Sequence, residues 1–571
     1  MNNNDSVYFI AFFGDKPPEY FENHVARYAA GIGLTYRLEK QNNAKMMFVK
    51  ASLGTIQNPA DILFSDTHPN GNFRQNSHYL HWETTTEEIT VYCAPWIVKQ
   101  IYYARCGNGW LISDDLRLMI GFASPEIDEV VLYACLQFNS APAPLTLFRS
   151  IRRTRPGCAY RFSFKAVIED THYRIPPLEN KTYNEAYQDT QKTLSDTIHS
   201  IPDRSVLFFS GGVDSALIMA YAGAIQKKIE PVFLSFGSDD PELSVASAIS
   251  TYLGMPLHVA EFTMEQAETQ MARIGLTYSF PFCDYATLPS MVLAEYVAQK
   301  FPRHSAIDGT GADGLHGGLT AYTKWQRRYR SPYLVRKMKS WMYRSLSLWR
   351  YDTAWSATLA KHKLSAEWPL PVAWYLARNP FNGILYTIPD SVKKEVLRYI
   401  LDQPMYHEQN LLANYAASDI QMACTGKAGA KLYDSMIRFG NRMIYPYLSP
   451  EFVDNGLSLP FSIKCRNGVN KSILKSMLAQ NIPNDLVYRK KKGFTPPMHK
   501  IFSEPRIRAY IENTVWKKDN PLLSFVDHGQ LNVLWRATAP SQTRLPRRAY
   551  EFMWNVTALS LWLDQVKKLW K

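Results

Sequence analysis

The sequence predicts a two-domain α/β protein, with a β-rich domain over residues 1–180 and a doubly wound α/β domain over residues 183–571. Three observations predict this fold class. The chain has 571 residues, 46% of them hydrophobic, which is enough for at least two packed cores. Its first third separates short apolar runs by turn-prone Gly, Asn and Pro, which is typical of sheets. After residue 200, apolar runs alternate with helical segments, which is typical of a parallel sheet covered by helices.

Charge and cysteine content narrow the class of protein. A net charge of +13 favours anionic partners without choosing among nucleotides, nucleic acids, membrane surfaces and acidic peptides. The seven cysteines are scattered and include no Cys-x-x-Cys pair, so we expect reduced thiols in a cytoplasmic protein. No apolar run approaches the length of a membrane span, and no basic segment precedes the first apolar run. We therefore expect neither a transmembrane helix nor a signal peptide.

The first domain is expected to be a packed sheet domain. Its composition shows no phosphate-binding loop and no metal-ligand spacing. A helix is predicted over residues 127–139. Strands are predicted over residues 7–13, 46–53, 89–98, 101–106, 110–113 and 159–164.

The second domain is organised around the stretch from Ser205 to Ala216. Residues 206–209 are continuously apolar, as expected for a strand buried on both faces of a parallel sheet. A glycine turn follows, and then a helix over residues 216–224. Strand, glycine turn and helix start together form an anion site, because free N–H groups at a helix N-terminus point at the anion.

Five residues of this turn are predicted to bind a nucleotide. Ser210, Gly211 and Gly212 form the turn, in which glycines let phosphate oxygens approach the backbone. Ser215 has a hydroxyl that can donate to phosphate. Asp214 has a carboxylate that can hold Mg²⁺.

The end of the next strand is predicted to lie beside the adenine and ribose. Apolar runs at residues 231–236 and 256–260 flank a helix over residues 242–253. Ligands of doubly wound sheets bind at the carboxyl ends of the strands. The prediction therefore places Leu234, Ser235 and Phe236 at the nucleotide.

A second glycine turn follows a short apolar strand between Ser305 and Gly318. It carries Asp308 and Asp313. Magnesium takes oxygen ligands and usually binds one or two carboxylates. The sequence therefore predicts that Asp214 and Asp313 hold Mg²⁺ on the phosphates of ATP.

These two turns resemble known motifs. The stretch Ser-Gly-Gly-Val-Asp-Ser at 210–215 resembles the pyrophosphate loop of N-type ATP pyrophosphatases, which transfer AMP to a substrate. The second turn resembles the G-x-G-x-D-E-x-x-x-G-G segment of asparagine synthetase. This resemblance implies that Gly309 and Gly311 bind the nucleotide and that Asp313 binds the metal. Gly314 stands where that family has a glutamate, which is consistent with a cavity enlarged for a bigger substrate.

A third motif runs from Ile482 to Pro497 and contains four consecutive cations. Composition alone would allow a solvated surface run. The order Pro, Arg-x-Lys-x-Gly-Phe, Pro resembles the same family, in which the lysine reaches the α-phosphate. The resemblance implies that Lys491 is catalytic, since a fixed cation stabilises charge that develops in a water-poor site.

The first domain also resembles this family. Residues 100–157 are similar to the second half of the Ntn-hydrolase-like, class II glutaminase domain of asparagine synthetase. That domain uses an N-terminal cysteine as nucleophile, whereas this sequence begins Met1-Asn2-Asn3. We expect a retained scaffold without glutaminase activity, so that glutamine is not the nitrogen source.

The superfamily implies a defined reaction. A carboxylate attacks the α-phosphorus of ATP, pyrophosphate leaves, and an amine attacks the acyl-adenylate to form an amide. β-Lactam synthetases deprotonate this amine with a Tyr–Glu dyad. Here Thr310 stands at the tyrosine position, and residues 315–351 contain no Asp or Glu. His316 is a candidate base in its place.

A basic and aromatic segment, residues 324–350, is the most unusual part of the chain. It carries nine Lys or Arg residues interleaved with Trp and Tyr. It is either an amphipathic helix with a basic outer face, a docking face for an acidic peptide or partner, a membrane-surface contact, or a nucleic-acid contact.

Taken together, the chain looks most like a lasso peptide cyclase. Such an enzyme adenylates an Asp or Glu side chain of a precursor peptide and joins it to the peptide's N-terminal amine. The resemblance implies a precursor peptide substrate, and a leader peptidase or leader-binding protein as partner, without nucleic acid. A small-molecule amide or β-lactam synthetase is the alternative with the same chemistry. A nucleotide-sensing or nucleic-acid-binding module is the alternative from another class.

Overall fold

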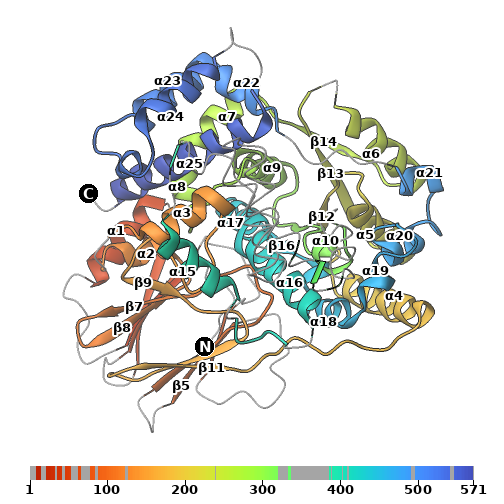
Figure 1. The fold of residues 1–571 in the computed structure, drawn as a ribbon, viewed down its shortest axis with the longest axis horizontal. Helices are drawn as coiled ribbons and strands as arrows, with labels where there is room; N and C mark the ends of the chain where they lie inside the picture. Colours follow the sequence, from red (N-terminus) through yellow and green to blue (C-terminus); the bar gives the residue numbers. More distant parts are fainter. Residues whose placement is uncertain are drawn as a thin grey trace.

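The structure is a computed structural model. It describes residues 8–13, 21–32, 35–41, 46–52, 62–65, 78–83, 88–122, 126–237, 240–318, 332, 334–335, 338, 385–386, 389–401, 403–407, 410–489, 496–539 and 545–569. Figure 1 shows the sheets of the N-terminal part at the lower left and the parallel sheet of the C-terminal part at the right. The basic and aromatic segment, apart from residues 332, 334–335 and 338, lies outside the described residues.

The N-terminal part contains two sheets that pack on each other. Their strand orders are β2-β3-β1-β8-β7-β9 and β11-β10-β6-β5-β4, and every pairing is antiparallel except that of β4 with β5. The strands are β1 (Tyr8–Phe13), β2 (Thr35–Gln41), β3 (Met46–Ser52), β4 (Ile62–Ser65), β5 (His78–Glu83), β6 (Glu88–Tyr92), β7 (Tyr102–Cys106), β8 (Gly109–Ser113), β9 (Ile151–Arg153), β10 (Cys158–Phe162) and β11 (Val167–Thr171).

Strand β1 is buried on both faces. Ala11 and Phe13 point into a core between the two sheets, while Ile10 and Phe12 point into the main core of the molecule. Helices α1 (Phe21–Ile32), α2 (Leu116–Ile120) and α3 (Glu129–Phe138) belong to this part of the chain.

The sequence predicted some strands of the first domain and missed others. Strands β1, β3, β6, β7, β8 and β10 confirm the predicted runs, and α3 confirms the predicted helix. The prediction missed helices α1 and α2 and strands β2, β4, β5, β9 and β11. The sequence of β11, VIEDT, shows why, because this edge strand is half-buried only at its two ends and exposed between them.

The C-terminal part is built on a five-stranded parallel sheet. Its order is β14-β13-β12-β15-β16, and all four pairings are parallel. The strands are β12 (Ser205–Phe208), β13 (Ile229–Ser235), β14 (His258–Glu261), β15 (Ser305–Ile307) and β16 (Arg442–Ile444). The chain moves outward from β12 to β14 and returns to β15 on the other side of β12. This reversal makes the β12–β15 boundary the topological switch point, where such sheets bind ligands.

The remaining described helices belong to the C-terminal part of the chain. They are α4 (Tyr183–His199), α5 (Val213–Ala224), α6 (Pro241–Tyr252), α7 (Met264–Met271), α8 (Ile274–Thr277), α9 (Thr287–Lys300), α10 (Ala312–Leu315), α15 (Asp390–Leu401), α16 (Leu411–Asp419), the π-helix η1 (Ile420–Ala428), α17 (Gly429–Arg438), η2 (Pro446–Leu448), α18 (Pro450–Ser458), α19 (Phe461–Lys464), α20 (Ser472–Leu478), α21 (Asn484–Val487), α22 (Met498–Ser503), α23 (Pro505–Val515), η3 (Pro521–Ser524), α24 (His528–Ala537) and α25 (Arg547–Leu569). None of the described helices is long and apolar enough to cross a membrane.

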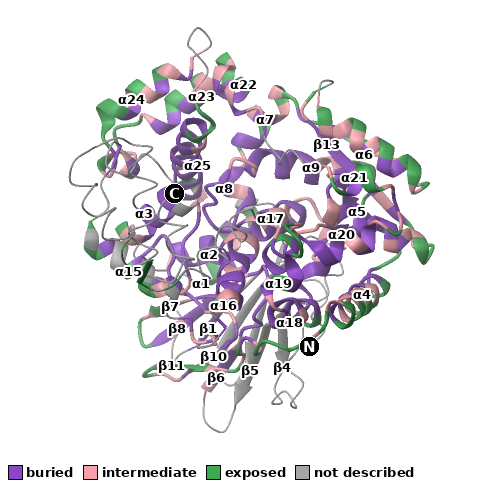
Figure 2. Ribbon diagram, turned by 45° about the vertical axis from the view of Figure 1, so that its right-hand side comes forward, coloured by how far each residue is buried: buried purple, intermediate pink, exposed green. Residues whose placement is uncertain are grey.

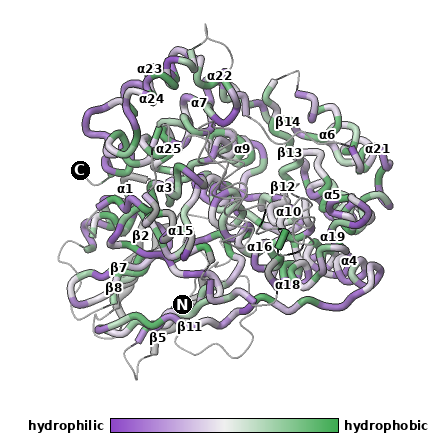
Figure 3. The backbone as a smooth tube through the Cα atoms, viewed as in Figure 1, coloured by the Kyte–Doolittle hydropathy of each residue, from purple (hydrophilic) through white to green (hydrophobic). Residues whose placement is uncertain are grey.

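Burial separates the inner helices from the outer ones. In Figure 2, α9, α17 and α25 are mostly buried, while α6 and α24 carry exposed residues. Hydrophilic residues gather at the periphery, for example around α23 and α24 in Figure 3. The long helix α25 contacts α3 of the N-terminal part as well as α8 and α23 of the C-terminal part. One continuous core therefore runs through both parts of the chain.

A buried arginine joins the two parts. Arg117 is fully buried and pairs with Asp115 at 2.7 Å. Its guanidinium also donates to the backbone oxygens of Gly275 (3.1 Å) and Leu276 (2.7 Å). A charged group of the N-terminal part thus satisfies carbonyls at helix α8 of the C-terminal part, and neither side can separate without exposing unpaired polar groups.

A buried carboxyl on α17 should make stability depend on pH. Burial raises the pKa of Asp434 to about 6, although the N–H and the hydroxyl of Ser279 both donate to it. A raised native pKa stabilises the fold at low pH, and this stabilisation is lost as the pH rises through about 6. Asparagine cannot ionise, so the free energy of unfolding of Asp434→Asn should not fall over this pH range. Relative to the wild type, this variant should become more stable by up to about 3 kcal/mol as the pH rises from about 4 to about 7. Urea denaturation checks this, and a difference independent of pH would contradict it.

Candidate active site

The predicted phosphate loop follows β12. The strand ends at Phe208 and α5 begins at Val213, so residues 209–212 form the turn. Gly211 has a positive φ of 63°, and Gly212 precedes the helix without a side-chain cap. The hydroxyl of Ser215 accepts from the N–H of Ser210 at 3.3 Å and holds the turn closed. The first N–H groups of α5 have no partner within the helix and lie at the carboxyl end of β12, as an anion site requires.

The phosphate loop needs a glycine at position 211 because a side chain there would have too little space. A Cβ at Gly211 would lie 3.2 Å from the backbone of Ala246 in α6, whereas a Cβ at Gly254, which has a similar φ of 68°, would meet nothing within 4 Å. Both Gly→Ala variants carry the cost of a left-handed residue, which is about 1–2 kcal/mol. We expect only Gly211→Ala to weaken ATP binding, by roughly tenfold. Calorimetric titration of both variants measures this, and equal affinities would contradict it.

The second glycine turn contacts the first. A Cβ added to Gly309 would lie 3.1 Å from the Cβ of Asp214, so glycine permits the two loops to meet. Within the second turn, Asp308 accepts from the N–H of Thr310 at 2.8 Å and from its hydroxyl. The Thr310 side chain is therefore oriented by a neighbouring carboxylate. Gly311, with φ of 110°, lies against Leu448 and Tyr447 of η2.

The two predicted metal ligands converge on a single cation. The ammonium of Lys471 lies 2.7 Å from both carboxylate oxygens of Asp214 and 2.6 Å from Oδ1 of Asp313. Burial alone would lower the pKa of Lys471, but the attraction of the two carboxylates outweighs it and raises the pKa. Two loops about 100 residues apart thus hold their carboxylates around one positive charge.

This donor set fits magnesium. Within the described residues no cluster of three or more His, Cys, Asp and Glu side chains could hold a metal ion. Magnesium commonly takes one or two carboxylates and completes its shell with phosphate oxygens and water. Asp214 and Asp313 meet this need at the mouth of the phosphate loop, and Lys471 marks the point where a cation is stable.

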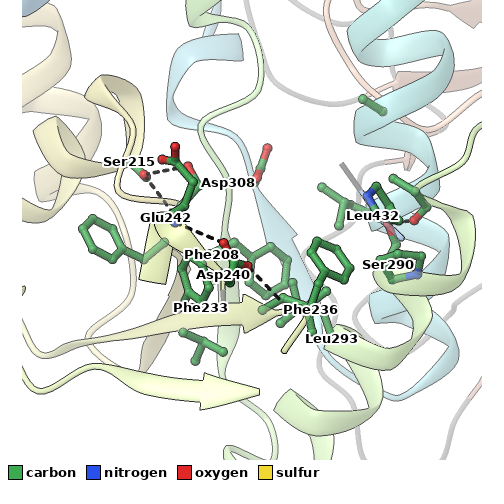
Figure 4. A pocket seen from close by; sticks show the side chains of 18 of the residues that line it. Phe208, Ser215, Phe233, Phe236, Asp240, Glu242, Ser290, Leu293, Asp308 and Leu432 are labelled. Carbon is green, nitrogen blue, oxygen red and sulfur yellow. Dashed lines mark hydrogen bonds between the residues drawn. The ribbon is translucent and has the colours of Figure 1, made fainter. Parts of the chain in front are cut away.

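A cavity of 1120 Å³ extends from these loops (Figure 4). Leu234 and Phe236, predicted at the nucleotide, line it, as do Ser210 and Gly309. Ser235 is buried and donates to the carbonyl of Gly237 instead. The full cavity lining is Phe208, Phe209, Ser210, Asp214, Ser215, Val232, Phe233, Leu234, Phe236, Gly237, Asp240, Pro241, Glu242, Ala286, Pro289, Ser290, Leu293, Asp308, Gly309, Thr310, Asp313, Ala428, Lys431, Leu432, Pro496, Pro497, His499 and Lys500.

The third motif contacts the phosphate loop through Arg489 and the cavity through its C-terminal end. Arg489 pairs with Glu242 at 2.7 Å and donates to the carbonyl of Gly211 at 3.0 Å, so it clamps the phosphate loop onto α6. Pro496 and Pro497 line the cavity. Lys491, the predicted catalytic lysine, lies outside the described residues.

Two expectations from the second turn do not match the structure. His316 is buried outside the cavity lining, and neither ring nitrogen has a hydrogen-bond partner. Burial and the ammoniums of Lys464 and Lys471 lower its pKa to about 3. This placement does not support His316 as the base. Gly314 does not enlarge the cavity either, because a Cβ there would lie 3.3 Å from the Oδ2 of Asp419 rather than face the cavity.

Sequence reasoning missed Lys471 entirely. It lies 257 residues from Asp214, in a stretch with no recognisable loop signature. Its backbone φ of 54° is left-handed, which no local pattern of the sequence predicts for a lysine. Arg489 lies inside the third motif, two residues before Lys491, to which the resemblance assigns the catalytic role.

A doubly wound parallel sheet with an anion loop and two converging carboxylates at its switch point defines a class of nucleotide-binding α/β enzymes. The family model of asparagine synthase matches residues 203–564, more than half of the chain. The chain therefore belongs to the asparagine synthase family, and it is an asparagine synthetase-like, ATP-dependent ligase.

Curated relatives extend this likeness over most of the chain. A glutamine-hydrolyzing asparagine synthetase 1 of Bacillus subtilis is 22% identical over 487 residues, which cover 79% of this chain and 73% of the relative. A putative glutamine-hydrolyzing asparagine synthetase of Mycobacterium tuberculosis is 25% identical over 446 residues, which cover 73% of this chain and 66% of the relative.

Among solved structures, an NH3-dependent NAD synthetase from Campylobacter jejuni, in complex with nitrate, is 15% identical. It covers 37% of this chain and 99% of its own, with a TM-score of 0.19. A likeness of that extent does not define a fold.

Proposed function

We propose that the chain is an ATP-dependent macrolactam synthetase of the lasso peptide cyclase type. In this proposal it adenylates an Asp or Glu side chain of a precursor peptide and joins it to the peptide's N-terminal amine, releasing AMP and pyrophosphate. A precursor peptide is the substrate, and a leader peptidase or leader-binding protein is the partner. The convergence of Asp214 and Asp313 at a large cavity carries the proposal.

The size of the cavity supports a substrate larger than aspartate. At 1120 Å³ it exceeds the usual range of small-molecule sites, which is about 300–1,000 Å³. A nucleotide at the phosphate loop would leave room for part of a peptide beside α9 and α17.

The N-terminal part supports a nitrogen source other than glutamine. Its described cysteines are Cys93, Cys106, Cys135 and Cys158, and only Cys106 is not buried. Burial raises the pKa values of Cys93, Cys106 and Cys158. A thiol with a raised pKa is a poor nucleophile. An amine carried by the peptide itself would need no such thiolate.

Several residues of the chain would have separate roles in the adenylation step. The N–H groups at the start of α5 bind phosphate oxygens, and Arg489 keeps the Gly211 turn in place. Lys471 neutralises charge beside the leaving pyrophosphate. When bound by Asp214 and Asp313, Mg²⁺ would neutralise phosphate charge.

Product analysis tests the proposal. The protein, ATP and Mg²⁺ are incubated with synthetic precursor cores that carry Asp or Glu at the ring position, and with matched Asn or Gln cores as controls. We expect AMP, pyrophosphate and a product lighter by one water from the acidic cores alone. Formation of ADP would contradict adenylation. Turnover with free amino acids and ammonia, but with no peptide, would favour the small-molecule alternative.

β-Lactam synthesis is the second candidate function, and the absence of the tyrosine weakens it. Thr310 stands at the position where a β-lactam synthetase has its tyrosine, and its hydroxyl donates to Asp308. An aliphatic hydroxyl lacks the acidity of a phenol, so Thr310 does not replace the tyrosine as the base for the amine.

A further inference from the structure

The far wall of the cavity differs in charge from the wall at the phosphate loop. Five carboxylates line the near wall and its neighbouring strand end: Asp214, Asp240, Glu242, Asp308 and Asp313. The lysines in the described lining are Lys431, which is buried on α17, and Lys500, which is exposed. The cavity therefore has an acidic side suited to a metal–nucleotide complex and a cationic group opposite it.

Lys431 is a buried ammonium held by a single carboxylate. Its side chain is 4% exposed and donates to Oδ1 of Asp284 at 2.9 Å. Asp284 is in turn fixed by the N–H of Ala286 at 2.7 Å, and its carbonyl accepts from the indole of Trp554. An ammonium carries three N–H donors. Asp284 is its one side-chain partner among the described residues, so Lys431 has donor capacity left at the cavity surface.

A second lysine lies beside the same carboxylate. The Nζ of Lys427 lies 3.8 Å from Oδ2 of the same carboxylate, and its side chain is 9% exposed. Burial would raise the pKa of Asp284, but the two ammoniums outweigh it and lower the pKa, so the carboxyl is ionised. Asp284 thus lies beside two ammonium groups. Lys427 is presented by the π-helix η1, a geometry that is frequent at functional sites.

We propose that Lys431, backed by Asp284 and Lys427, binds the substrate carboxylate that is to be activated. This rests on the proposed function, because it names the group that the adenylation step consumes. A carboxylate at Lys431 faces the nucleotide wall of the same cavity. One of its oxygens forms the new bond to the α-phosphorus, the bond from that phosphorus to the bridging oxygen breaks, and its electron pair leaves with pyrophosphate. Lys431 would accept acids and reject the neutral amides of the same shape.

Binding of two matched probes tests this inference without turnover. The probes are N-acetyl-aspartate α-amide and the neutral N-acetyl-asparagine α-amide, titrated calorimetrically into the full chain with Mg²⁺ and α,β-methylene-ATP. We expect the wild type to prefer the acid by roughly tenfold or more, since hydrogen bonds to charged groups are the stronger ones. Lys431→Met and Lys431→Gln should lose this preference, and Lys431→Arg should retain it. The affinity for the ATP analogue should stay within about twofold in all variants.

Each other outcome overturns the inference. A wild type that does not distinguish the probes would do so, and so would a Lys431→Gln variant that keeps the preference or instead loses ATP affinity. Thermal unfolding of each variant shows that it is folded, and Asp284 retains Lys427 and the Ala286 N–H when Lys431 is replaced. The inference and the proposed function can fail separately. A Lys431-dependent preference without AMP formation would refute adenylation alone, and AMP formation without the preference would refute the anion site alone.

Discussion

Replacing Asp214 by asparagine is expected to lower AMP formation by about 10³-fold or more, and Asp313→Asn should do the same. Asp214 and Asp313 are the two carboxylates of one cation site. Loss of either one should remove several kcal/mol of stabilisation from the transition state of adenylation. The fold should survive, because Lys471 keeps its 2.6 Å contact with Asp313 when Asp214 is neutral. Steady-state release of AMP and pyrophosphate, with thermal unfolding in parallel, measures both effects.

Asp203→Asn is the matched control. Asp203 is exposed at the opposite end of β12 and has none of the contacts of Asp214. Its variant should retain wild-type turnover. Activity of Asp214→Asn within about tenfold of the wild type would remove Asp214 from the metal site.

Replacing Arg117 by alanine is expected to cost about 3–5 kcal/mol of unfolding free energy. The change would leave Asp115 charged and fully buried without its partner, and the carbonyls of Gly275 and Leu276 without their donor. Because these carbonyls belong to the other part of the chain, the N-terminal part should loosen from α8. Chemical denaturation measures the loss.

An exposed arginine provides the comparison. Arg161 pairs with Asp170 at 2.9 Å, but the two side chains are 47% and 58% exposed. Arg161→Ala should change stability by less than about 1 kcal/mol, because water screens such pairs. If the two variants were equally stable, the Arg117 network would not join the two parts of the chain.

The elements around the nucleotide could be predicted because they are local. Strand β12 is a continuous apolar run that ends in glycines, and this pattern predicts both the strand and the loop. The same holds for β15 and Asp313. Their meeting was predicted from the general rule that ligands gather at the carboxyl ends of parallel strands. The order β14-β13-β12-β15-β16 places β12 beside β15 and so brings the two loops side by side.

Long-range contacts set the limit of sequence reasoning. Lys471 reaches the two carboxylates only because α20 packs on α5, and no spacing in the sequence encodes this packing. The prediction for His316 failed for the opposite reason. A histidine in a glycine-rich motif is a candidate base by its local sequence, but α10 turns His316 inward against Phe452. The cationic wall at Lys431 likewise depends on α9 and α17 packing together.

One crystallographic measurement tests the central claim most directly. Crystals of the full chain are soaked with Mn²⁺ and α,β-methylene-ATP, and the anomalous signal of manganese is located. The account predicts a manganese peak within coordination distance of the carboxylates of Asp214 and Asp313, with the triphosphate at the start of α5 and Lys471 moved from between the carboxylates to the phosphates. A peak away from these two residues, or a triphosphate bound while Lys471 still bridges them, would contradict it.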